Sequence, residues 1–108
     1  MSVKEKYGIV FHSKIVEGIK YNICDVINPN YYNLSFINRF AANETSDMID
    51  DLNRCITHQG NSSDFYQSDS IEYVHTIQYK YPDMIIDDIL IPMKDLKELL
   101  NEWLIFIR

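Results

Sequence analysis

Residues that can act as acids, bases, nucleophiles or metal ligands occur in this chain, but their spacing matches no catalytic or metal-binding motif. The three histidines, His12, His58 and His75, include no pair at positions i and i+4, the arrangement by which a helix holds a metal. The spacing of the two cysteines, Cys24 and Cys55, fits no zinc site either. Each cysteine lies in an apolar pattern, which predicts two buried, reduced thiols, while a disulfide would require the two backbones to meet. We therefore expect no metal and no cofactor.

Nucleophilic catalysis and nucleotide binding also lack their sequence patterns. No serine stands in a Gly-x-Ser-x-Gly context, and the 3 glycines are far apart in the chain. The pairs Asp50-Asp51 and Asp87-Asp88 could together hold a divalent metal for phosphodiester cleavage, so a metal-dependent hydrolase is one hypothesis. Adjacent side chains on a helix or a strand point in different directions, which favours a solvated acidic surface instead. We predict that the protein is not an enzyme.

The composition favours binding to a protein partner. The chain has 16 acidic against 10 basic residues and a net charge of −6, so it repels nucleic acid and anionic membranes and attracts a basic protein surface. Its 8 tyrosines belong to a residue type enriched in protein-binding surfaces. The candidate partner-binding residues are acidic or aromatic and lie on a predicted helix, in the loop after it and at the start of the next strand: Asp47, Asp50, Asp51, Asp64, Tyr66, Asp69 and Glu72.

The N-terminal third predicts strands. Apolar residues alternate over 7–11 and again over 19–23, and Glu17-Gly18 separates the two runs as a turn. The turn signal Asn28-Pro29-Asn30 comes next, and 31–40 is compatible with a third strand. A helix over 3–16 remains an alternative.

Two helices are predicted from spacing. In the first, 45–58, Thr45 or Ser46 is the cap, and one face is apolar while the other carries Asp47, Asp50, Asp51 and Arg54. The second begins at Pro92, and its apolar residues recur at helical spacing: Leu96, Leu99, Leu100, Trp103, Leu104 and Ile107.

Between these helices the pattern returns to strands. Strict alternation over 71–79 predicts a half-buried strand, and Tyr81-Pro82-Asp83 predicts a turn. The stretch 84–91 is apolar on both faces except for Asp87 and Asp88, which suggests a central strand or a strand with a bulge at the two aspartates.

Together these elements predict a single α+β domain over 1–108. We expect one antiparallel sheet of about four or five strands with two helices packed on it and the C-terminal helix last. The charged N-terminus does not look like a secretory signal, and no stretch has the apolar length of a membrane span, so we expect a cytoplasmic protein.

The last fifth of the chain resembles a known class of proteins. Ile91-Pro92, followed by Leu96, Leu99, Leu100 and Trp103 and an aromatic-aliphatic tail, resembles the ends of small bacterial immunity proteins. These are the antitoxins of polymorphic toxins, including contact-dependent growth inhibition systems. The resemblance implies an inhibitor that binds a cognate toxin, often a nuclease, and covers its active-site region. The alternative hypothesis is a non-catalytic adaptor or regulatory subunit that self-associates through an exposed strand edge.

Overall fold

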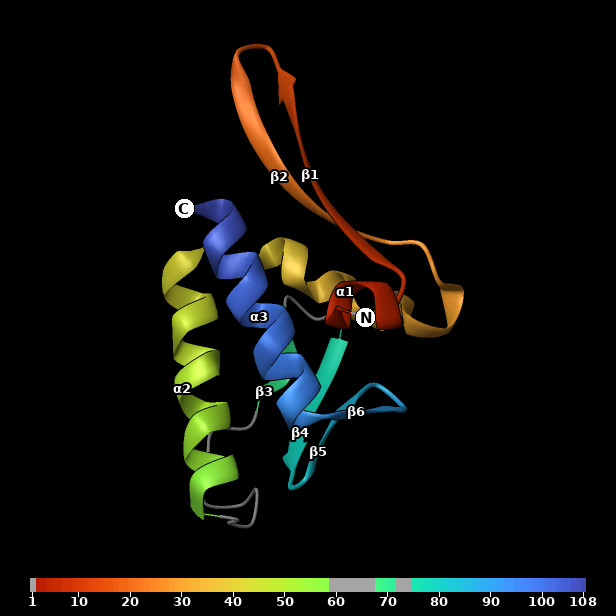
Figure 1. Ribbon diagram of the computed structural model, residues 1–108, viewed down its shortest axis with the longest axis vertical. Helices are drawn as coiled ribbons and strands as arrows, with labels where there is room; N and C mark the ends of the chain where they lie inside the picture. The colour runs from red at the N-terminus through yellow and green to blue at the C-terminus, as the bar shows by residue number, and fades with distance from the viewer. Residues whose placement is uncertain (1, 59–67, 72–74) are drawn as a thin grey trace.

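The computed structural model describes residues 2–58, 68–71 and 75–108 (Figure 1). As the sequence predicts, the fold is α+β with antiparallel strands and a C-terminal helix. No helix among the described residues is long and apolar enough to cross a membrane. The elements follow the chain in this order: α1 (Val3–Lys6), β1 (Ile9–Val16), β2 (Ile19–Val26), the 3₁₀-helix η1 (Pro29–Arg39), α2 (Ala42–His58), β3 (Ser68–Ile71), β4 (His75–Lys80), β5 (Asp83–Ile86), β6 (Ile89–Pro92) and α3 (Met93–Ile107).

The first two strands form the predicted hairpin. β1 and β2 pair antiparallel from Ile9 opposite Val26 to Val16 opposite Ile19. Glu17 and Gly18 form the turn with φ angles of 53° and 80°, the left-handed backbone that suits a two-residue hairpin turn. A Cβ on Gly18 would meet no atom within 4 Å, so the glycine is explained by its backbone angle and not by crowding. The alternative of a helix over 3–16 is wrong, because only Val3–Lys6 is helical there.

The predicted third strand over 31–40 is also wrong. This stretch is η1, which begins where the side chain of Asn28 accepts a hydrogen bond of 3.0 Å from the backbone N–H of Asn30. Leu34, Phe36, Ile37 and Phe40 are buried. Leu34, Ile37 and Phe40 stand three residues apart, which is the period of a 3₁₀-helix, and the Phe36 ring packs against that of Phe40 with centroids 5.2 Å apart. The apolar content of the segment thus reflects helical packing and not the alternation of a strand.

The described strands do not all lie in the single sheet that the sequence predicts. They fall into two sheets, the hairpin β1–β2 and a second sheet in the order β3-β4-β5-β6. The predicted strand 71–79 includes the end of β3 and most of β4, and 84–91 is divided into β5 and β6 by a turn at Asp87, where φ is 56°. Asn33 donates a 2.6 Å hydrogen bond to the Asp87 carboxylate. The apolar run therefore belongs to a tight hairpin and not to one central strand.

The two long helices lie side by side, and α3 packs on β5 and β6 of the second sheet (Figure 1). α2 begins three residues before the predicted start. Thr45 is inside the helix and donates to the Ala41 carbonyl at 2.7 Å, while Glu44 accepts from the Ala41 N–H at 3.1 Å. Four of the six α3 residues that the spacing predicts are buried, namely Leu96, Leu99, Leu100 and Trp103, while Leu104 and Ile107 are only partly buried. The indole N–H of Trp103 donates to the Phe40 carbonyl at 3.1 Å.

A polar cluster ties the N-terminus to α3. The Asp95 carboxylate accepts from the Lys6 ammonium at 2.7 Å and from the Tyr7 hydroxyl at 2.5 Å. Burial by itself would raise the pKa of Asp95, but the hydrogen bonds from Lys6 and Tyr7 outweigh it and lower the pKa below its ordinary value. Burial and the contact with Asp95 raise the pKa of Tyr7. The cluster holds α1, and with it the start of β1, against α3.

Candidate partner-binding site

Two of the candidate carboxylates lie together on the exposed side of α2. Asp47 and Asp50 are exposed and stand three residues apart, which places them on neighbouring positions of one helix face. Within the described part of the chain neither takes part in an ion pair. Both carboxylates can therefore meet cations from outside the molecule.

Asp51 does not belong to this exposed face, which corrects the prediction made from spacing. It is only 9% exposed, forms an ion pair with Arg54 on the same helix, and accepts a 3.5 Å hydrogen bond from the Tyr79 hydroxyl of β4. Four residues after Asp47, the helix has turned by about 40° beyond a full circle, toward its packed side. Asp51 consequently joins α2 to the second sheet and is not available to a partner.

The remaining candidates form no described cluster. Asp69 lies in β3, while Asp64, Tyr66 and Glu72 fall outside the described residues. The described part of the predicted site is therefore the pair Asp47 and Asp50.

The described residues include histidine, cysteine and carboxylate side chains, which are the usual metal ligands and nucleophiles. They contain no group of three or more histidine, cysteine or carboxylate side chains arranged to hold a metal ion. Cys24 and Cys55 are buried thiols, as predicted. Burial raises the pKa of Cys24 to about 12 and also raises that of Cys55, so both stay in the thiol form, which is the less reactive one.

A second surface, the β1–β2 hairpin, is one that the sequence reasoning did not select. Figure 1 shows the hairpin extending away from the rest of the molecule, and every residue from His12 to Tyr21 is exposed. Its sequence is nevertheless apolar toward the tip, where Ile15 and Ile19 are 73% and 56% exposed. The sequence contains one sign of this surface, the apolar pair Ile15-Val16 directly before the turn. Adjacent strand residues point to opposite faces and only one face can pack on a core, so one of the two side chains is expected to be exposed.

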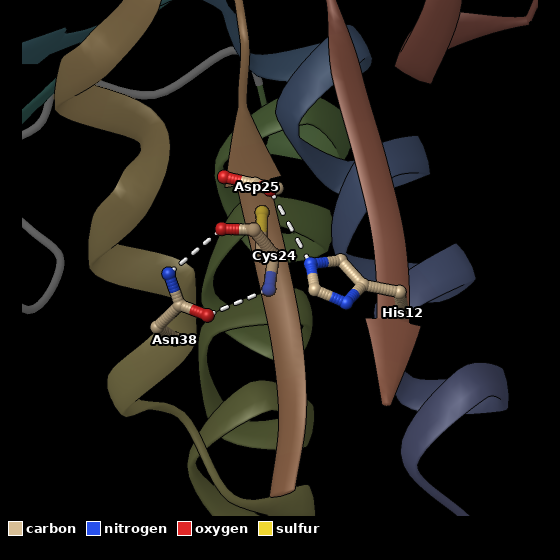
Figure 2. A network of polar contacts seen from close by, with 4 residues as sticks. All are labelled: His12, Cys24, Asp25 and Asn38. Carbon is tan, nitrogen blue, oxygen red and sulfur yellow. Dashed lines mark hydrogen bonds and ion pairs between the residues drawn. The ribbon is translucent and has the colours of Figure 1, made fainter. Parts of the chain in front are cut away.

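The base of the hairpin is fixed by a side chain that takes the place of a third strand (Figure 2). Asn38 of η1 accepts from the Cys24 N–H at 2.6 Å and donates to the Cys24 carbonyl at 2.8 Å. On the exposed face, a His12–Asp25 contact of 3.3 Å joins the two strands. The outer edge of β2 is thus covered at Cys24.

The outer edge of β1 is different. Because the backbone groups of Cys24 point toward Asn38, they point away from β1, and the Phe11–Cys24 pair is a non-hydrogen-bonded one. By the alternation of an antiparallel ladder, the N–H and C=O groups of Ser13 and Ile15 then point outward as well. β2 is the one described strand that pairs with β1. This edge is therefore open to another strand.

Comparisons with known proteins return no relative for this chain. No family model, no curated protein and no solved structure matches it. The features of the molecule that bear on function are the two surfaces described above, the exposed carboxylates of α2 and the hairpin.

Proposed function

We propose that this protein is an immunity protein that binds a cognate toxin, a nuclease, and neutralises it by covering the basic active-site region. The observation that carries the proposal is the exposed pair Asp47 and Asp50 on α2, which forms no ion pair with a cation among the described residues. The resemblance of the last fifth of the chain to small immunity proteins and the net charge of −6 agree with it.

The physical basis is charge complementarity. A nuclease holds its substrate with lysine and arginine side chains that neutralise phosphates. Carboxylates on a rigid helix can occupy the same cations, and an acidic molecule is steered toward them at low salt. Asp47 and Asp50 would meet these cations directly. Asp51 and Arg54 would contribute little, since they already neutralise each other.

The experiment is growth rescue by the chain, co-expressed with the C-terminal toxin domain encoded immediately upstream of its gene. The expected result is survival together with a one-to-one complex that co-purifies. A harmless upstream domain, or killing that continues in the presence of this chain, would overturn the proposal and leave the adaptor hypothesis as the one to pursue.

Charge reversal then tests the surface. The double variant Asp47→Lys and Asp50→Lys is expected to slow association with the toxin domain by about tenfold or more at low salt and to flatten its salt dependence. The matched control is Asp88→Lys with Glu98→Lys, which changes the net charge equally at exposed positions outside α2. Equal slowing in both double variants would assign the effect to overall charge and exclude the α2 face as the contact.

A further inference from the structure

The half of the hairpin nearest the turn carries apolar side chains that no other described residue covers. Ile15, Val16 and Ile19 are all largely exposed there. A two-stranded ribbon without a packed face is marginally stable in water, and an unpaired apolar edge is a template for another strand. These properties call for a strand that pairs with the hairpin from outside the chain.

Charge identifies the kind of strand that fits. β1 has the sequence IVFHSKIV, which contains no carboxylate, although the chain as a whole carries a net charge of −6. A second copy of the chain would be repelled over much of the surface, but it can approach along β1 without bringing carboxylates of the two β1 strands together. The outer edge of β2 is less suitable, since Asn38 covers it at Cys24.

We propose that two copies of this protein dimerise by antiparallel pairing of β1 with β1, in a register centred on Ser13. This register places the outward-pointing backbone groups of both strands opposite each other. It also pairs apolar side chains with each other: Val10 lies opposite Val16 of the second copy, and Phe11 lies opposite Ile15. His12, which contacts Asp25 within its own hairpin, lies opposite Lys14. The result is a four-stranded sheet with two-fold symmetry, in the order β2-β1-β1-β2.

Neighbouring registers match less well. A shift of two residues in one direction sets Val10 opposite Lys14 and Phe11 opposite Ser13, which pairs apolar with polar side chains. A shift in the other direction sets the two Lys14 ammonium groups against each other, and like charges directly opposite destabilise a sheet. The ring centroids of Phe11 and Trp103 lie 5.1 Å apart. In the proposed register, Ile15 of the second copy lies opposite Phe11 and therefore extends this aromatic cluster.

The dimer does not depend on the proposed function, because neither Asp47 nor Asp50 takes part in it. Success or failure of toxin rescue therefore does not decide the dimer. A dimer through this edge without toxin rescue would agree with the adaptor hypothesis, which predicts self-association through an exposed strand edge.

The test is sedimentation equilibrium of the full chain at concentrations up to about 0.5 mM, where even weak association populates dimer. Ser13→Pro removes one outward N–H from β1 and is expected to raise the dissociation constant by about tenfold or more, because the symmetric interface loses two hydrogen bonds. The matched control is Asn22→Pro. Ser13 and Asn22 share a 2.9 Å hydrogen bond that both variants lose, but Asn22→Pro leaves the β1 edge intact and should still dimerise.

The outcomes are distinct. A wild-type chain that remains monomeric overturns the proposal, and so does a dimer that dissociates equally in both variants or in Asn22→Pro alone. Circular dichroism verifies that each variant is folded.

Cross-linking tests the register without proline. Facing Ser13 residues in a hydrogen-bonded pair have Cα atoms about 5.5 Å apart, within disulfide range. Ser13→Cys is expected to give a covalent dimer on mild oxidation, visible on a non-reducing denaturing gel, whereas Asn22→Cys is expected to stay monomeric. Equal cross-linking of the two variants, or none in Ser13→Cys, would contradict the register.

Discussion

The C-terminal helix and the hairpin both carry many apolar side chains and place them in opposite surroundings. In α3, Leu96 and Leu100 are fully buried and Trp103 is 2% exposed, because α2 and the second sheet cover the apolar face of the helix. Near the hairpin turn, Ile15 and Ile19 remain mostly exposed. Amphipathic periodicity thus marks a face that the chain itself covers, whereas apolar residues on both faces of a projecting ribbon have no such cover within the described fold.

The largest loss of stability should come from a substitution in α3, the buried member of this comparison. Trp103→Ala removes a nearly buried indole and its hydrogen bond to the Phe40 carbonyl, so we expect the free energy of unfolding to fall by about 3–5 kcal/mol. Denaturant unfolding measures it. Ile105→Ala, on the exposed side of the same helix at 72% exposure, should change stability by less than about 0.5 kcal/mol. Similar losses for the two variants would mean that α3 is not packed as described.

The second-largest loss of stability should come from the connection between the hairpin and the rest of the molecule. Asn38→Ala removes both hydrogen bonds to the backbone of Cys24 and should cost about 1–2 kcal/mol. Amide hydrogen exchange at Cys24 should also accelerate, because its N–H loses its partner. Ser35→Ala is the control, since its side chain is not part of the Asn38 contacts with Cys24. Unchanged protection at Cys24 in Asn38→Ala would contradict the role of Asn38 as a substitute strand.

The attachment of α1 to α3 should depend on pH. Asp95 has a pKa below its ordinary value of 3.8 in the folded protein, so the stability that it contributes is present above that value and is lost as the pH falls through the lower, folded pKa. The raised pKa of Tyr7 has the opposite consequence, a loss of stability as the pH rises beyond about 10.

Asp95→Asn tests the loss of stability at low pH separately from that at high pH. We expect a loss on the order of 1 kcal/mol at neutral pH and a flatter fall in stability in acid. Thermal unfolding across the pH range measures both. Asp88→Asn, at an exposed position, serves as the control, and a variant at Asp95 with the same acid profile as the wild type would contradict this assignment.

The smallest effect should come from the hairpin tip in the dilute, monomeric protein. Ile15→Thr and Ile19→Thr remove apolar groups that no described residue covers, and threonine is also a good strand former. Each should therefore change the free energy of unfolding by less than about 0.5 kcal/mol. A loss close to that of Trp103→Ala, measured by the same denaturant method, would show that the tip is packed against the molecule and would remove the contrast.

Local signals predicted some elements well. The hairpin was predictable because Glu17-Gly18 is a turn of the required handedness between two alternating runs, and α3 was predictable because its apolar spacing is regular. The segment 31–40 was not, since three buried residues in a 3₁₀-helix resemble a short strand when only their hydrophobicity is considered. The division of 84–91 depends on a positive φ at Asp87, which is not a position that proline or glycine marks.

The candidate site was predictable only in part. Helical spacing correctly placed Asp47 and Asp50 on an exposed face, but it could not separate them from Asp51, because a residue at the margin of a helix face is buried or exposed according to its neighbour. Here that neighbour is Tyr79, 28 residues further along the chain.

The sequence by itself determined the acidic charge, the α+β class, the hairpin and the closing helix, because each follows from composition or from contacts between residues close in the chain. Tertiary structure decided the division into two sheets, the burial of Asp51 and the covering of one hairpin edge by Asn38. These features depend on residues distant in sequence that meet only when the chain folds, and local periodicity contains no information about which of them will meet.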